Sequence, residues 1–304
     1  MKNAQAEAAA TAAPIQVARR PAGRLSDYVA LAKPRLNVLV VASSAAGYYL
    51  GSPSAPQLTP MALAVGGTAL VAGGAAVLNQ VYERDTDALM MRTRLRPLPD
   101  HRVGIDEARA FGIALAAAGI AVLSLSANLL AALVAAATLL IYLAVYTPLK
   151  RRSAISTLVG AVPGALPPLI GWTAGRGAID AGGWTLFAIV FLWQIPHFMA
   201  IAWIYRDDYR RAGFPMLPVV EPDGARTGRQ ALLYALALVP VSLLPALVGV
   251  SGLAYFWCAL VLGVTFLVLA ARFAALRSEG RARTLFYGSL LYLPLIWAVM
   301  ILDH

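Results

Sequence analysis

The sequence predicts an all-α, multi-pass membrane protein with nine transmembrane helices. This prediction rests on the composition, on a series of long apolar stretches and on the placement of the charges. Of the 304 residues, 60% are hydrophobic and 13% are charged, whereas soluble domains contain about 45–50% apolar and about 25% charged residues. Most side chains are therefore expected to face lipid or other apolar side chains.

Nine apolar stretches approach the roughly 20 residues that a spanning helix needs. They follow a polar, Ala-rich tail over 1–24, which is predicted to be disordered and cytoplasmic, and they make 25–304 one transmembrane domain. Turn-forming residues at 126–128 and 249–252 predict two tight helical hairpins. The single Cys258 is expected to be a small buried side chain. The nine stretches are 36–52, 59–81, 108–126, 128–147, 154–174, 184–205, 231–249, 252–274 and 284–302.

The basic residues predict how the chain is oriented in the membrane. The net charge is +10, and with nine spans every Lys and Arg except Arg176 falls on one side. The positive-inside rule assigns that side to the cytoplasm, so the N-terminus is predicted inside and the C-terminus outside. Membrane topology accounts for the basic charge, and no nucleic-acid partner is expected.

A polar row at the end of the second stretch is the first candidate site. Asn79, Glu83 and Asp87 are spaced i, i+4, i+8 and share one helix face, whereas Asp85 points away from it. Stacked carboxylates repel one another unless a cation lies between them, and Mg²⁺ favours a few carboxylates together with substrate phosphates. The row therefore predicts a Mg²⁺–diphosphate site, and the alternative is a solvated helix end. Arginines suited to bidentate phosphate binding follow at once: Arg84, Arg92, Arg94 and Arg96.

Four further segments carry candidate functional residues. Asp207 and Asp208 close the sixth stretch on the same side and are expected to form the other half of the site, unless they lie in a solvated loop. The triplet that begins at Lys150 is explained by topology when taken alone. His197 lies about two turns before Tyr205 and is either a packing residue or a group that contacts haem or handles protons. Glycines and prolines between 160 and 171 indicate either close helix packing or a broken helix beside a cavity.

Together these segments resemble the UbiA superfamily of intramembrane prenyltransferases, and within it the branch that farnesylates haem. The resemblance runs from roughly residue 25 to residue 300. This sequence departs from the family pattern at Glu83, where Asp is usual, at Ser156, where Asn is frequent, and at His101, where Gly is frequent. The matching segments are Asn79 to Asp87, Arg92-Thr93, Arg96-Pro97, Tyr146 to Arg152, Pro163 to Trp172, Trp193 to Phe198 and Asp207 to Val220.

The resemblance implies nine helices around a lipid-accessible cavity and a specific reaction. In that reaction a farnesyl group moves from farnesyl diphosphate to the 2-vinyl group of haem b, water adds, and haem O and diphosphate are released. The adjacent Asp207 and Asp208 replace the wider spacing of other branches, which leaves open which of them faces the metal. The expected localisation is the cell inner membrane, and the expected partner besides lipid is haem A synthase.

The roles implied for single residues follow from the same resemblance. Asn79, Glu83, Asp87 and Asp208 are expected to hold Mg²⁺, with Asp207 as a further catalytic carboxylate. His197 is expected to face haem. Diphosphate is expected to bind Lys33, Arg92, Arg96, Lys150 and Arg210.

Three other functions remain open at this point. A quinone or chlorophyll-type acceptor would keep the metal site and change the cavity. A nonenzymatic assembly factor would tolerate loss of the acidic face. A transporter is disfavoured, because transporter sites lie near the membrane midplane and these carboxylates lie at helix ends on one side.

Overall fold

The computed structural model describes residues 23–304, so nearly all of the predicted tail over 1–24 lies outside the described residues. The described part of the chain is helical and contains no strand. Eight of its helices are long and apolar enough to cross a membrane. The count is nine if α1 and α2, which are bent by 46° at their junction, form one span. This agrees with the predicted all-α architecture of nine spans.

The helices follow the predicted stretches closely, although their polar ends extend further. α5, the π-helix η1 and α6 are continuous over Leu129–Leu149. In chain order the elements are α1 (Arg24–Ala32), α2 (Pro34–Gly51), α3 (Leu58–Leu89), α4 (Ile105–Ser126), α5 (Leu129–Leu140), η1 (Ile141–Tyr146), α6 (Thr147–Leu149), α7 (Ser156–Arg176), α8 (Ala181–Ile204), α9 (Arg206–Arg211), α10 (Leu217–Val220), α11 (Ala225–Leu247), α12 (Leu253–Leu276) and α13 (Glu279–Leu302).

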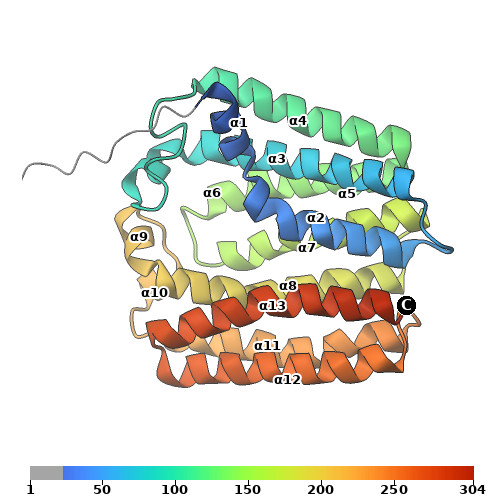
Figure 1. The fold of residues 1–304 in the computed structure, drawn as a ribbon. Coiled ribbons are helices and arrows are strands. Elements are labelled where there is room, and N and C mark those ends of the chain that lie inside the picture. The colour runs from blue at the N-terminus through green and yellow to red at the C-terminus, as the bar shows by residue number, and fades with distance from the viewer. Residues whose placement is uncertain (1–22) are drawn as a thin grey trace, which may run out of the picture.

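The long helices lie side by side, and the two ends of the bundle differ (Figure 1). The short helices α6, α9 and α10 gather at one end, and the C-terminus lies at the other. The tight hairpins are confirmed: Asn128 caps α5 by accepting a hydrogen bond from the N–H of Ala131, and α11 and α12 are separated by residues 248–252 alone. The candidate site residues therefore collect at the end that holds α9 and α10.

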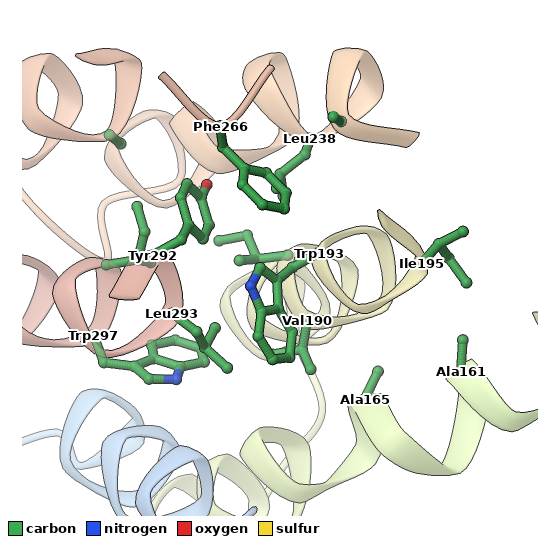
Figure 2. Close-up of a cluster of buried hydrophobic side chains, with 14 of the residues drawn as sticks. Ala161, Ala165, Val190, Trp193, Ile195, Leu238, Phe266, Tyr292, Leu293 and Trp297 are labelled. Carbon is green, nitrogen blue, oxygen red and sulfur yellow. The ribbon is translucent and has the colours of Figure 1, made fainter. Parts of the chain in front are cut away.

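The largest buried cluster joins α8 and α13 with α11 and α12. Figure 2 shows Trp193 of α8 beside Leu293 and Trp297 of α13, with Phe266 of α12 close by. The indole N–H of Trp193 donates to the Ser289 carbonyl at 2.9 Å, which fixes α8 against α13. This half of the bundle is therefore a continuous apolar core.

α2 and α7 pack backbone to backbone. A Cβ at Gly171 would overlap the carbonyl oxygen of Ser44, and one at Gly47 would overlap the carbonyl oxygen of Pro168. α7 continues unbroken through its three internal prolines. The Gly and Pro pattern thus reflects close packing, as small residues do at membrane helix interfaces, rather than a broken helix.

Cys258 is exposed on α12, so the expectation that it is buried was wrong. A thiol behaves as a small apolar group. In a membrane bundle such a group can face lipid as well as the interior, so hydrophobicity alone did not determine its position.

Candidate active site

α3 carries the predicted polar row into the interior of the bundle. The helix continues to Leu89, beyond the end of the apolar stretch at 81. The side chains of Asn79, Glu83 and Asp87 all lie inside, with residue exposures of 4%, 4% and 1%. The side chain of Asp85 is 85% exposed and pairs with Arg84 at 3.0 Å. The helical spacing therefore separated the inward residues from the outward one correctly.

Asn79 is oriented by the neighbouring span. Its amide Nδ2 donates to Thr147 Oγ1 at 3.2 Å, and the Thr147 hydroxyl donates to the Tyr142 carbonyl at 2.7 Å. Pro148 lacks an N–H and disturbs the helical bonding before it, and the preceding turn widens into η1. Such π-helical turns often occur at functional sites. The amide oxygen of Asn79 remains free to bind a ligand, since no described residue donates to it.

Glu83 forms a buried ion pair with Lys150. The Lys150 ammonium lies 3.0 Å from Oε1 and 3.1 Å from Oε2 of Glu83. The same ammonium lies 4.7 Å from the ring centroid of Phe214, a cation–π contact. Lys150 thus connects the polar row on α3 with the segment after α9.

Asp87 has one paired and one unpaired oxygen. Oδ2 accepts a hydrogen bond from Arg96 at 2.6 Å, and the Thr93 hydroxyl donates to the Asp87 carbonyl at 2.7 Å. Oδ1 is buried and has no hydrogen-bond partner among residues 23–304. A buried carboxylate oxygen without a donor is unfavourable, so this atom is suited to a bound cation.

Lys33 lies at the break between α1 and α2. It adopts a left-handed conformation, with φ 50°, and Pro34 begins the next helix. Gln80 and Asn37 donate to the carbonyls of Leu31 and Ala32, which α1 leaves unpaired at its end. Lys33 is close enough to Glu83, Asp87, Arg96 and Lys150 to interact with their charges. The break therefore adds a cation to the same site.

The second acidic segment divides between the interior and the surface. Asp208 is buried and pairs with Arg211, whereas Asp207 is exposed and pairs with Arg210 at 2.8 Å. This favours Asp208 over Asp207 as the inward carboxylate. Arg210 is about half exposed and lies on the surface beside Asp207.

Aromatic contacts connect the two acidic segments. The Arg92 guanidinium lies 5.0 Å from the ring centroid of Tyr205 and 6.0 Å from that of Tyr209. Met90, at the end of α3, shares a buried cluster with Tyr209 and Phe214. The structure thus brings the segments after α3 and α8 together, as the sequence predicted.

The residues present suit a Mg²⁺ ion that also binds substrate phosphate. Within residues 23–304 no three His, Cys, Asp or Glu side chains are close enough to form a complete metal site. Mg²⁺ is, however, commonly held by one or two carboxylates, water and substrate phosphates. The unpaired Asp87 Oδ1 and the free amide oxygen of Asn79 are suitable oxygen ligands.

His197 lies on α8 and is held against α13. Its ring stacks with those of Trp193 and Phe286, with a centroid distance of 5.2 Å to each. Its Nδ1 lies 2.7 Å from the Ser289 hydroxyl oxygen. His197 is therefore separate from the charged row, and no described contact joins it to Glu83 or Asp87.

Several residues that position the site were not predicted to have a role. Thr147, Thr93 and Phe214 contact Asn79, Asp87 and Lys150, and Ser289 contacts His197. Thr93, Thr147 and Phe214 lie in segments that match the family pattern. Ser289 carries no local signal, because its importance arises from contacts between distant helices.

Known proteins are similar to this chain in sequence and in fold. Residues 40–296 match the UbiA prenyltransferase family. The protein named protoheme IX farnesyltransferase of Solibacter usitatus (strain Ellin6076) is 49% identical over 289 residues, covering 92% of this chain and 99% of that protein. The protein of the same name from Salinibacter ruber (strain DSM 13855 / M31) is 45% identical over 279 residues, covering 92% and 99%.

Two solved structures share the fold at low sequence identity. The apo structure of a UbiA homologue from Aeropyrum pernix K1 has a TM-score of 0.71 at 22% identity and covers 89% of this chain and 98% of its own. A UbiA homologue from Archaeoglobus fulgidus, bound to GPP and Mg²⁺, has a TM-score of 0.66 at 18% identity, with coverage of 90% and 99%. With the family match over most of its length, this chain belongs to the UbiA prenyltransferase family.

Proposed function

We propose that this protein transfers a farnesyl group from farnesyl diphosphate to the 2-vinyl group of haem b, with addition of water, giving haem O and diphosphate. The single observation that carries the diphosphate half is the buried row Asn79, Glu83 and Asp87, enclosed by Lys150 and Arg96. The haem half rests on the relatives at 42–49% identity that are named protoheme IX farnesyltransferase.

The polar row would bind the metal ion, and the cations around it would bind the diphosphate. Asn79, Glu83, Asp87 and Asp208 would hold Mg²⁺, which supplies positive charge to the phosphate oxygens. Lys33, Lys150, Arg92 and Arg96 would bind the same oxygens, and Arg210 would supply positive charge from the surface beside Asp207. The ion pairs seen in the structure keep the cations in place before substrate arrives.

The reaction follows from these positions. Neutralising the diphosphate makes it a better leaving group, so the C–O bond breaks and its electron pair stays on diphosphate. The vinyl π electrons attack the allylic farnesyl carbon and form the new C–C bond. Water then captures the resulting cation and loses a proton. The apolar side chains of α8 and α13 would keep other water away from these cations.

The protein is proposed to lie in the cell inner membrane, with the site at the cytoplasmic face and the C-terminus outside. This follows from the positions of the basic residues. Haem O would leave within the bilayer, and a haem A synthase in the same membrane is the proposed recipient.

The proposal is tested with purified protein, haem b, farnesyl diphosphate and Mg²⁺, followed by mass analysis of the haem. Asp87→Asn is expected to lower turnover by about 10²-fold, since it weakens charge stabilisation in a water-poor site. The matched control is Asp85→Asn, which lies two residues away on the exposed side of the same helix and is expected to stay within about twofold of wild type.

Two results would count against this function. Wild-type turnover by Asp87→Asn at saturating Mg²⁺ would contradict the metal site. Unchanged haem in a mixture where a quinone precursor becomes prenylated would keep the diphosphate site and reject haem as the acceptor.

A further inference from the structure

Ser289 makes hydrogen bonds with two side chains of α8. It is completely buried on α13. Its carbonyl accepts from the Trp193 indole N–H at 2.9 Å, and its hydroxyl oxygen lies 2.7 Å from His197 Nδ1. The hydroxyl also contacts the Phe286 carbonyl oxygen at 2.5 Å. One small residue therefore joins the helix that carries His197 to the helix that supplies its stacking partner.

The contact with Phe286 determines where the single hydroxyl proton lies. A carbonyl oxygen carries no hydrogen, so an oxygen–oxygen contact of 2.5 Å is favourable only if the Ser289 hydroxyl donates to it. If the hydroxyl turned towards His197 instead, two oxygen lone pairs would face each other at that distance. Ser289 Oγ is therefore the acceptor in its contact with His197.

The neutral imidazole must then carry its proton on Nδ1. A neutral histidine has one N–H and one lone pair, and the hydrogen bond made by one nitrogen fixes the state of the other. Because Nδ1 donates to Ser289, the lone pair lies on Nε2. Nε2 makes no hydrogen bond within residues 23–304 and is not among their enclosed, unpaired polar atoms. His197 is only partly buried, so this nitrogen is available to a ligand.

The ring around this lone pair is held rigidly. Trp193 stacks with it at an interplanar angle of 22°, and Phe286 stacks with it at an angle of 30°. A flip of the ring would lose the bond to Ser289, and a smaller rotation would disturb the stacks as well. Fixing a ligating histidine through its other nitrogen typically changes metal affinity by about 10–100-fold.

We infer that Ser289 is a positioning residue that holds His197 as the Nδ1–H tautomer, so that Nε2 ligates the iron of the haem substrate. The inference rests on the proposed function, since that function supplies the haem. Recognition of the acceptor then depends on the contact between α8 and α13, away from the charged row on α3.

The tautomer is measured first, on wild-type protein without substrate. The chain has only three histidines, so ¹⁵N-histidine NMR of detergent-solubilised protein can read each ring, and His197→Ala identifies the signal of interest. A protonated Nδ1 with a bare Nε2 is the expected result. The opposite tautomer would overturn the inference, whether or not the protein farnesylates haem.

Haem titration then tests the role of Ser289. Ser289→Ala is expected to weaken ferric haem b binding by about tenfold and to reduce the Soret signature of histidine ligation, while the KM for farnesyl diphosphate is unchanged. Ser242→Ala is the matched control, because Ser242 is equally buried and donates to a carbonyl three residues earlier without contacting His197. It is expected to bind haem as wild type does.

A double mutant separates positioning from packing. In a His197→Ala background, Ser289→Ala is expected to cause no further loss of haem affinity, since both changes remove one interaction. A further tenfold loss in that background would show that Ser289 acts through helix packing and would overturn the inference. Wild-type affinity and spectrum in the Ser289→Ala single variant would do the same.

Discussion

At the scale of single residues, the carboxylates of the site are held by ion pairs before any substrate binds. Glu83 is almost completely buried and lies 3.0 Å from Lys150, whose side chain is 14% exposed. A charge removed from water in this way is stable only while its partner stays in place. Removing one partner of the pair is therefore expected to affect both the stability of the protein and its activity.

Replacing Lys150 alone is expected to destabilise the protein. Lys150→Met leaves the Glu83 carboxylate buried without a partner, at a cost of about 3 kcal/mol. The double variant Lys150→Met with Glu83→Gln removes both charges and is expected to recover most of the thermal stability but no farnesyl transfer. Thermal unfolding in detergent and the haem mass assay measure the two effects.

A different pattern would contradict this account of the pair. If the double variant were less stable than Lys150→Met alone, the charge imbalance would not be the cause of the loss. Asp85→Asn is the surface control, since it breaks an exposed pair with Arg84 and such pairs contribute little.

The residues of the polar row could be predicted, whereas the uncharged residues that orient the site could not. Asn79, Glu83 and Asp87 follow a local helical period, which a single sequence shows directly. Thr147 lies 68 residues from Asn79, and Ser289 lies 92 residues from His197. Such contacts are set by how distant helices pack, and no local spacing indicates them.

At the scale of whole elements, glycines set the distance between α2 and α7. A Cβ at Gly171 would overlap the Ser44 carbonyl oxygen, so the two backbones touch at this position. The sequence could not decide between packing and a broken helix, because glycine and proline serve both. The unbroken course of α7 through its prolines decides for packing.

Gly171→Ala is expected to lower stability by about 1–3 kcal/mol, the usual effect of overfilling a well-packed interior. Gly66→Ala on α3 is the matched control, because an added Cβ there meets no atom within 4 Å. Alanine is the better helix former by up to about 1 kcal/mol, so this control is expected to be neutral or stabilising. Equal Tm values for the two variants would show that the α2–α7 contact can separate without cost.

At the scale of the whole molecule, composition and charge predicted the number of spans but not which sides of the helices face lipid. The apolar stretches and the turns between them matched the helices, because length and hydropathy are properties of the chain itself. The position of Cys258 was mispredicted, because lipid and the protein interior both accept apolar side chains. What decides between them is the arrangement of neighbouring helices.

The same charge pattern makes a prediction about sidedness that labelling can check. Both labelling variants are made in a Cys258→Ser background. Ser54→Cys places a thiol in the loop between α2 and α3, and Arg151→Cys places one directly after α6, at the end of the bundle that holds the site. Because nearly all basic residues share the side of Arg151, a membrane-impermeant maleimide applied to intact spheroplasts is expected to label Ser54→Cys alone, and Arg151→Cys only after lysis. The reverse pattern would place the diphosphate site outside, where it would have no access to cytoplasmic farnesyl diphosphate.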